Sequence, residues 1–245
     1  MFDLSICQEL FDRDPVRYLD MTEAVRRGIG TVLYASPTAA LVDIPSPEQP
    51  DAFHTYLMCC AGLEEATLLC GLLPAGGRFL LAAHEEFCVP LLKERFGATL
   101  FLEGASYQAA YLRTQPPVLQ DYVLAIRQLD VSDLPQVSAH YQLEGADYLC
   151  SLLDRGQLFG GFQNGTLAGF VGRHAEGSIG LLEILPQYRR QGFATALERY
   201  MIDLELSLCH IPFGQVLTDN APSLALQRSL GMTISSGTLC WLSCD

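Results

Sequence analysis

The chain has 245 residues, of which 49% are hydrophobic, and a formal net charge of −13 at pH 7. This length can bury one large core or two smaller ones, and the acidic excess argues against a partner bound through nucleic-acid phosphates. No run approaches the roughly 18 uninterrupted apolar residues of a membrane span, and the start "MFDLSICQELFDRDP" does not have the basic-then-apolar order of a secretory signal. We therefore expect a cytoplasmic globular protein with no nucleic-acid or membrane partner.

The double proline at 116–117 is followed by the strand-like run "YVLAIRQL" and marks a domain boundary. We expect two domains, 1–116 and 117–245, each near the usual size of a single domain. Strand and helix patterns alternate in the first domain, which is typical of an α/β layer. The patterns predict helices near 5–13 and 22–27, a hairpin over 31–44, strands over 52–60, 78–84 and 98–113, and helices over 63–73 and 87–97.

The second domain has a similar alternation around a hairpin, which Asn164-Gly165 signals between two apolar runs. Its pattern predicts helices packed on a sheet, so both domains are expected to be α/β. The predicted elements are strands over 122–129, 178–185, 213–219 and 238–243, and helices over 132–141, 146–156, 192–209 and 222–231.

The nine cysteines are an odd number, have no CxxC spacing and lie in apolar runs such as "YLMCCAG". This usage is typical of reduced thiols in a hydrophobic core and of a reducing compartment. We therefore predict no metal site.

The segment "PQYRRQGFAT" at 186–195 joins the strand-like run "GLLEIL" to the predicted long helix. The first N–H groups of a helix have no carbonyl partner and lie at the positive end of the helix dipole, so they favour a phosphate. Gly192 lets the backbone approach a ligand closely, and Arg189 and Arg190 add positive charge. The junction predicts an anion site, with a pyrophosphate as the expected ligand; the alternative is an ordinary helix start with solvated arginines.

In this context, "LLEILPQYRRQGFATAL" resembles the acyl-CoA-binding signature of the GNAT superfamily of N-acetyltransferases, with Arg189, Gly192 and Ala194 at its defining positions. The segment "DNAPSLALQRSLGM" at 219–232 resembles a second GNAT segment, and it follows the first at the family's distance. The resemblance covers roughly 120–245 and implies the GNAT fold, an α/β fold with a mixed sheet. The element order of the first half suggests a degenerate GNAT-like domain in tandem.

The resemblance also implies where acetyl-CoA, or another acyl-CoA, would bind. The pantetheine arm would run along the strand, the pyrophosphate would contact the amides of the turn, and Asn220 would contact the cofactor from the other side. The alternative role of Asn220 is an ordinary helix N-cap before Pro222. The expected cofactor-binding residues are Leu182, Glu183, Ile184, Arg189, Arg190, Gln191, Gly192, Phe193, Ala194, Thr195, Asn220 and Gln227.

Acyl transfer to an amine needs a base for the amine and an acid for the departing thiolate. In many family members the acid is a tyrosine seven residues after the asparagine, but Gln227 occupies that position here. Because an amide cannot supply the proton, three alternatives follow: the CoA thiolate leaves without help, Tyr188 or Tyr200 supplies the proton, or the domain is not catalytic.

The expected base is Glu183, the only charged residue inside "GLLEIL". A carboxylate in an apolar strand is costly unless it is paired or used, and burial would favour proton uptake. The alternative is a solvent-facing position on an edge or bulged strand. Glu176 and His174 are reserves, although the polar segment "RHAEGS" predicts a surface position at a turn for His174. The candidate catalytic residues are Glu183, Glu176 and Tyr188.

The leading functional hypothesis is an enzyme, an acyl-CoA-dependent N-acyltransferase with acetyl-CoA as the expected donor. A primary amine of a small molecule or peptide would attack the thioester directly. The alternative is a non-catalytic CoA-sensing or interaction module with the same fold, acting as a monomer or homodimer in either case. A dinucleotide site fails because the Gly-x-Gly-x-x-Gly pattern is absent.

Overall fold

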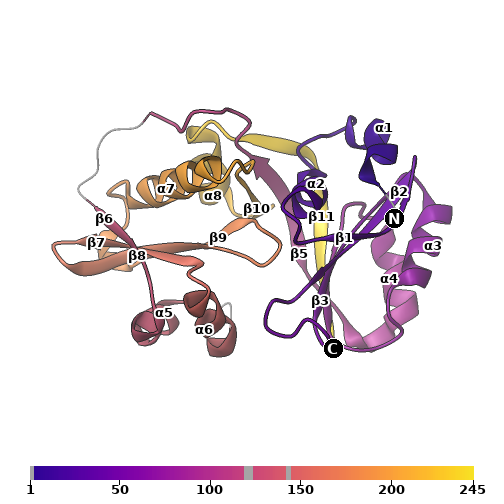
Figure 1. The fold of residues 1–245 in the computed structure, drawn as a ribbon, viewed down its shortest axis with the longest axis horizontal. Helices are drawn as coiled ribbons and strands as arrows, with labels where there is room; N and C mark the ends of the chain where they lie inside the picture. Colours follow the sequence, from indigo (N-terminus) through magenta and orange to yellow (C-terminus); the bar gives the residue numbers. More distant parts are fainter. Residues whose placement is uncertain (1–2, 119–123, 142–144) are drawn as a thin grey trace. The chain divides into compact units, whose positions relative to one another are not determined.

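The computed structural model describes residues 3–118, 124–141 and 145–245, so part of the strand predicted over 122–129 lies outside the described residues. The chain folds into two compact units (Figure 1). Unit 1 comprises Met1–Ala110, Gln215–Leu224 and Thr233–Asp245, and unit 2 comprises Tyr111–Gly214 and Ala225–Met232. The last third of the chain therefore contributes alternately to both units. The two expected domains, in contrast, share a single boundary in the sequence, and their assignment stays a prediction.

A seven-stranded sheet forms the centre of unit 1, in the order β1-β2-β3-β4-β11-β5-β10. It is mixed, because β3 and β4 are parallel while β2 and β3, among other pairs, are antiparallel. Its strands are β1 (Thr31–Ser36), β2 (Ala39–Pro45), β3 (His54–Cys60), β4 (Phe79–Ala83), β5 (Leu100–Ala110), β10 (Phe213–Leu217) and β11 (Thr233–Cys244). The helices that begin in this unit are η1 (Leu4–Cys7), α1 (Gln8–Phe11), α2 (Leu19–Arg26), α3 (Leu63–Leu72), α4 (Cys88–Phe96), η2 (Gly97–Thr99) and α8 (Ala221–Ser229).

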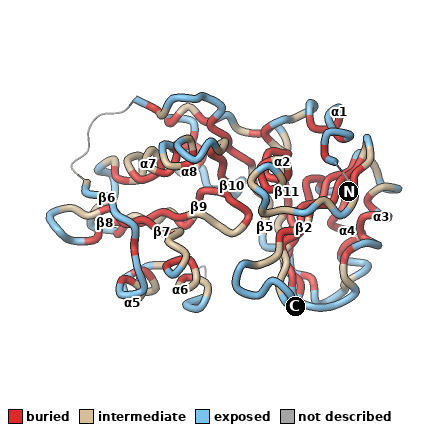
Figure 2. Tube along the Cα trace, in the orientation of Figure 1, coloured by how far each residue is buried: buried red, intermediate tan, exposed pale blue. Residues whose placement is uncertain are grey.

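The central strands of this sheet are buried on both faces, as Figure 2 shows. In β2, Ala39 and Leu41 belong to one apolar cluster, while Ala40, Val42 and Ile44 belong to another. Side chains of a strand alternate between the two faces, so a near-continuous apolar run is what two covered faces require. This requirement accounts for the apolar run in β2.

The C-terminal strand β11 lies inside the sheet of unit 1, between β4 and β5, and is antiparallel to both. Trp241 is paired with Ala82 of β4 on one side and with Gly104 of β5 on the other. Both hydrogen-bonding edges of β11 are therefore occupied within the chain, so this strand does not offer an edge to a second subunit.

A four-stranded antiparallel sheet, β6-β7-β8-β9, forms the centre of unit 2. Helices α5 and α6 cover one face of this sheet and α7 covers the other (Figure 1). The strands are β6 (Ala125–Gln128), β7 (Leu158–Gln163), β8 (Thr166–Arg173) and β9 (Ile179–Ile184). The helices are η3 (Val131–Asp133), α5 (Leu134–His140), α6 (Ala146–Asp154), η4 (Pro186–Tyr188) and α7 (Phe193–Ser207).

The predicted hairpin is confirmed between β7 and β8. Gln163 pairs with Thr166, and the two residues between them, Asn164 and Gly165, have φ angles of 51° and 79°. Two consecutive positive φ angles define the tight turn that Asn-Gly favours. Across the described ranges, every helix is too short or too polar to span a bilayer.

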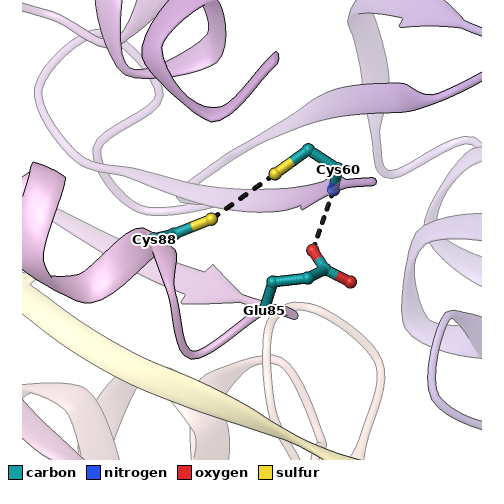
Figure 3. A group of neighbouring side chains, drawn as sticks. All are labelled: Cys60, Glu85 and Cys88. Carbon is teal, nitrogen blue, oxygen red and sulfur yellow. Dashed lines mark hydrogen bonds between the residues drawn. The ribbon is translucent and has the colours of Figure 1, made fainter. Parts of the chain in front are cut away.

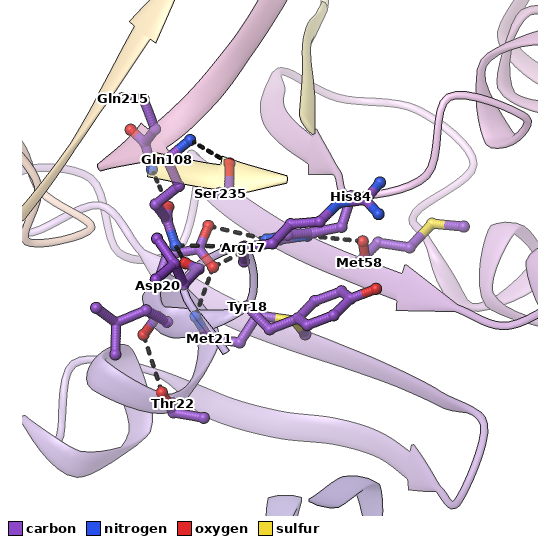
Figure 4. Close-up of polar contacts among 12 residues, drawn as sticks. Arg17, Tyr18, Asp20, Met21, Thr22, Met58, His84, Gln108, Gln215 and Ser235 are labelled. Atoms are coloured by element: carbon purple, nitrogen blue, oxygen red, sulfur yellow. Dashed lines mark hydrogen bonds and ion pairs between the residues drawn. The ribbon is translucent and has the colours of Figure 1, made fainter. Parts of the chain in front are cut away.

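A charged pair is completely buried in unit 1 (Figure 4). His84 Nε2 lies 2.9 Å from Asp20 Oδ1, and His84 Nδ1 lies 2.9 Å from the carbonyl oxygen of Met58. Both acceptors are satisfied only when both ring nitrogens carry a proton. Burial lowers the pKa of His84, but the charge and hydrogen bond of Asp20 outweigh that effect, and the pKa is raised above 6.5.

This pair makes stability depend on pH. A histidine whose pKa is raised by folding stabilises the protein fully below its unfolded pKa, and the stabilisation is lost as the pH rises through the folded pKa. We expect the free energy of unfolding, measured in denaturant titrations, to fall as the pH rises above 6.5. Asp20→Asn should cost about 3–5 kcal/mol at pH 6 and remove this part of the pH dependence; an unchanged pH dependence in the variant would contradict the assignment.

Candidate functional site

The site begins on β9, which is an edge strand of the sheet in unit 2. Phe170 of β8 pairs with Glu183, and Gly172 pairs with Gly180, so two residues of β9 stand opposite one of β8. One of these two, Leu181, has a φ of 55°. This is a β-bulge, which bends a strand and redirects its main-chain groups. Among the described strands none pairs with the other edge of β9, which therefore offers main-chain donors and acceptors to a ligand.

The turn after β9 leads directly into the start of α7. Arg190 has a φ of 61° and Gly192, the N-cap of α7, has a φ of 83°. No side chain caps this helix start, and the bond from the N–H of Ala196 to the carbonyl oxygen of Gly192 (3.1 Å) closes the first helical turn. The N–H groups of 193–195 precede that bond and have no intrahelical acceptor. The predicted helix start with Gly192 is confirmed, and its geometry suits an anion.

Arg189 and Glu183 hold the two ends of this turn together. The guanidinium donates from Nη2 to Glu183 Oε1 (2.9 Å) and from Nε to the carbonyl oxygen of Ile184 (2.9 Å). The Glu183 side chain is 26% exposed, and that of Arg189 is 57% exposed. An ion pair at a bulged edge strand thus accounts for a charge within the apolar run, and the role of Glu183 as a base stays a prediction.

The remaining residues predicted around the turn lie on or beside it. Phe193 is buried, and the ring of Tyr188 lies tilted against it with the centroids 6.3 Å apart. Gln191 is exposed and donates to the carbonyl oxygen of Gln187 (3.1 Å). The half-buried members of the set are Leu182, Ile184, Ala194 and Thr195.

Asn220 belongs to unit 1, and its side-chain oxygen accepts the N–H of Ser223 (3.1 Å). This bond caps the start of α8, which is the ordinary role that an asparagine before Pro222 predicts. Cofactor binding by Asn220 stays a prediction.

Glu176 lies in the turn between β8 and β9 and is only 8% exposed. Its carboxylate accepts a hydrogen bond from the hydroxyl of Ser178, so the two residues form one buried polar pair. The turn predicted for "RHAEGS" is present, with the N–H of Gly177 donating to the carbonyl oxygen of His174 (3.0 Å).

Gln227 has a buried partner that the sequence interpretation missed. Its Nε2 donates to Oε1 of Glu198 on α7 (3.0 Å), and Glu198 is only 4% exposed. Gln227 Oε1 is buried and has no partner within the described ranges. Burial raises the pKa of the Glu198 carboxyl to about 7, although the hydrogen bond from Gln227 opposes that rise. Where the GNAT resemblance implies an acid, the chain therefore has an amide bound to a carboxyl group that takes up a proton near neutral pH.

Cys60, Glu85 and Cys88 form the one group in the described part of the chain whose donor atoms lie close enough together for a metal ion (Figure 3). The two sulfur atoms are 3.5 Å apart. Both oxygens of Glu85 already accept hydrogen bonds, Oε1 from Tyr18 (2.9 Å) and Oε2 from the N–H of Cys60 (2.8 Å). Hydrogen bonds therefore satisfy both buried oxygens of Glu85. Seven of the nine cysteines are buried as expected, whereas Cys150 is half-buried and Cys209 is exposed.

The Glu198 carboxyl makes a testable contribution to stability. Its pKa is raised from 4.5 to about 7, because the folded protein favours the protonated carboxyl group. The free energy of unfolding of the wild type therefore falls as the pH rises through this range. The difference in free energy of unfolding between Glu198→Gln and wild type should therefore change in favour of the variant by roughly 2–3 kcal/mol from pH 5 to pH 8. Denaturant titrations at both pH values measure this difference. The exposed Glu94→Gln is the matched control, and an equal pH dependence in both variants would contradict the assignment.

Solved structures share this fold over most of the chain. A Drosophila melanogaster protein has a TM-score of 0.71 at 15% identity, covering 99% of this chain and 94% of its own. A GCN5-related N-acetyltransferase from Kribbella flavida has a TM-score of 0.57 at 10% identity, covering 94% and 95%. A GCN5-related N-acetyltransferase-like protein from Streptococcus suis has a TM-score of 0.53 at 13% identity, covering 91% of both chains. No curated protein matches the sequence.

The model of the acetyltransferase (GNAT) family matches residues 123–232. This range contains the bulged strand β9, the uncapped start of α7 and the Glu198–Gln227 pair. The fold and the family model agree with the expected α/β architecture and with the resemblance of the two sequence segments. Residues 123–232 thus match the GNAT family of acetyltransferases, within a chain that shares the fold of GNAT proteins over nearly its whole length.

Proposed function

We propose that the protein is an acyl-CoA-dependent N-acyltransferase, with acetyl-CoA as donor and a primary amine of a small molecule or peptide as acceptor. The observation that carries the proposal is the uncapped helix start at Gly192, directly after a bulged edge strand in a GNAT domain. The first element suits a pyrophosphate, and the second suits an extended arm that carries amide groups. A CoA thioester has both parts.

The fit to CoA follows from the main-chain groups. Three N–H groups at 193–195 have no intrahelical acceptor and can donate to phosphate oxygens, and the helix dipole adds positive potential there. Arg190 is exposed beside them and adds a full charge. Along β9, amides of the pantetheine arm can hydrogen-bond to the free edge as an added strand does. Leu182 and Ile184 lie on that strand.

Direct transfer requires the amine to be neutral when it attacks the thioester carbonyl. The C–N bond then forms, the C–S bond breaks, and a proton from the amine nitrogen ends on the CoA sulfur. The acceptor's identity is set by side chains around the thioester, so we limit the proposal to the class of primary amines. The proposed compartment is a reducing one such as the cytoplasm, because seven of the nine cysteines are buried, as core thiols are.

A non-catalytic CoA-binding module is the second candidate, and one observation favours it. Gln227 uses its amide to bind the buried Glu198, so this position supplies no hydroxyl acid to a thiolate. A module of this kind would bind acyl-CoA through the same helix start without releasing CoA.

The cofactor site can be tested by adding one methyl group at the N-cap. Gly192 has a φ of 83°, which an alanine adopts at a cost of roughly 1–2 kcal/mol, so Gly192→Ala should displace the N–H groups of the turn. We expect about a tenfold higher Kd for acetyl-CoA by isothermal titration calorimetry. Gly165→Ala is the matched control, because it has a φ of 79° at the β7–β8 hairpin and open space around it. Equal Kd values for both variants would contradict the site.

Turnover decides between the enzyme and the module. Wild-type protein with acetyl-CoA and a panel of amines, amino acids and polyamines should release free CoA thiol, measured with a thiol reagent. Binding of acetyl-CoA without thiol release for any acceptor would favour the module. Absence of binding would contradict both.

A further inference from the structure

His174 is fixed in space by the turn that connects β8 to β9. Its N–H donates to the carbonyl oxygen of Ser178 (2.9 Å), and its carbonyl oxygen accepts the N–H of Gly177 (3.0 Å). The Glu176–Ser178 side-chain pair closes the same turn from within. The backbone of His174 is therefore held by two hydrogen bonds within a turn that a third bond closes, and its ring is half-buried.

The imidazole ring is also held by an aromatic partner from α6. The hydroxyl of Tyr148 lies 3.0 Å from His174 Nδ1, and the two rings stack with centroids 6.2 Å apart and an angle of 14° between planes. When Nδ1–H donates to the tyrosine oxygen, Nε2 keeps its lone pair and can accept a proton. The contact at Nδ1 holds the ring in place, and Nε2 is the basic nitrogen in the tautomer whose Nδ1–H donates to the tyrosine oxygen.

Nε2 lies directly over β9, and a glycine makes this possible. A Cβ added to Gly180 would lie 2.5 Å from His174 Nε2, so any larger residue would displace the ring. Gly180 immediately precedes Leu181, the residue with the positive φ in the bulge. His174 Nε2 therefore lies beside the point where the strand bends.

The open edge of β9 ends near Gly180, because main chain covers the strand at Ile179. The carbonyl oxygen of Ile179 lies 2.6 Å from the position that a Cβ on Gly214 would take, so main chain covers the edge at Ile179. A ligand that extends along β9 from the α7 start therefore meets covered strand beyond Gly180. The far end of such a ligand would lie beside the bulge and beneath His174.

The charged neighbours of His174 are already engaged with other groups. Arg173 Nη2 forms an ion pair with Glu205 Oε1 on α7 (2.8 Å), and Glu176 accepts a hydrogen bond from Ser178. The polar contact that reaches the ring itself within the described ranges is the one from Tyr148. This arrangement leaves Nε2 directed at the strand instead of at a carboxylate.

We propose that His174, positioned by Tyr148, is the general base of the acyl transfer, an inference that rests on the proposed function. Nε2 accepts one proton from the acceptor ammonium, and the freed lone pair of the amine forms the C–N bond at the thioester carbon. The C–S bond breaks, the second proton passes from nitrogen to the CoA sulfur, and His174 later returns its proton to solvent. Imidazole is the side chain most often used for such a transfer.

The first test requires no knowledge of the acceptor. Protein labelled with ¹³C-histidine gives ring signals for five histidines, and the His174 signal is identified by its loss in His174→Gln. We expect acetyl-CoA and CoA to shift this signal while the signal of exposed His140 stays in place. Binding without any shift of His174 would overturn this inference and leave the proposed function standing. Absence of binding would overturn both.

The second test measures the proton transfer itself. With an amine that wild type acetylates, His174→Gln should lower kcat at least 100-fold and leave the Kd for acetyl-CoA unchanged, whereas His140→Gln should retain wild-type kcat. Tyr148→Phe should give a smaller loss and move the pH dependence of kcat, because it removes the partner of Nδ1. A normal kcat in His174→Gln, or a wild type that binds acetyl-CoA but acetylates no amine, would overturn the assignment.

Discussion

An edge strand must leave one row of main-chain donors and acceptors without a strand partner, and unit 2 does so at β9. Its bulge at Leu181 bends the strand, and the chain then turns through two left-handed residues into an uncapped helix. Each of these features is unfavourable alone, because each leaves polar backbone unpaired or strained. Together they form one continuous polar surface that a nucleotide thioester can satisfy.

Unit 2 supports this surface through buried polar contacts on both faces of its sheet. On one face, α7 carries Glu198 and Glu205 toward Gln227 and Arg173. On the other face, Tyr148 of α6 holds the ring of His174 over Gly180. Strand β9 is thus supported on both faces of the sheet, while the edge opposite β8 is covered at Ile179 and pairs with no strand of the described part of the chain. Supporting contacts of this kind hold the groups of a binding site in position before the ligand binds.

Local patterns predicted most elements, and the turn at 186–195 was predicted as the anion site because its residues are contiguous. The pairing of β11 with β4 and β5 was missed, since an apolar strand pattern does not specify its neighbours. Glu198 was missed although a signal existed. It lies on the same buried stripe as Leu197, Met201 and Ile202, where the helical period expects an apolar residue. The surface position of His174 was inferred from its polar neighbours in sequence. The space for its ring comes from Gly180 on the next strand, and the sequence pattern does not show that the two residues are in contact.

The position of β11 has a consequence for biosynthesis. Strands β4 and β5 leave the ribosome before β11, and β11, which lies between them and pairs with both, is the last strand of this sheet to be made. Until then the facing edges of both strands have no native partner, a condition that favours pairing with other chains. Closure of this sheet also waits for contacts between residues that are very far apart in sequence, which slows folding. A chain that ends before Thr233 would leave this sheet split into two parts.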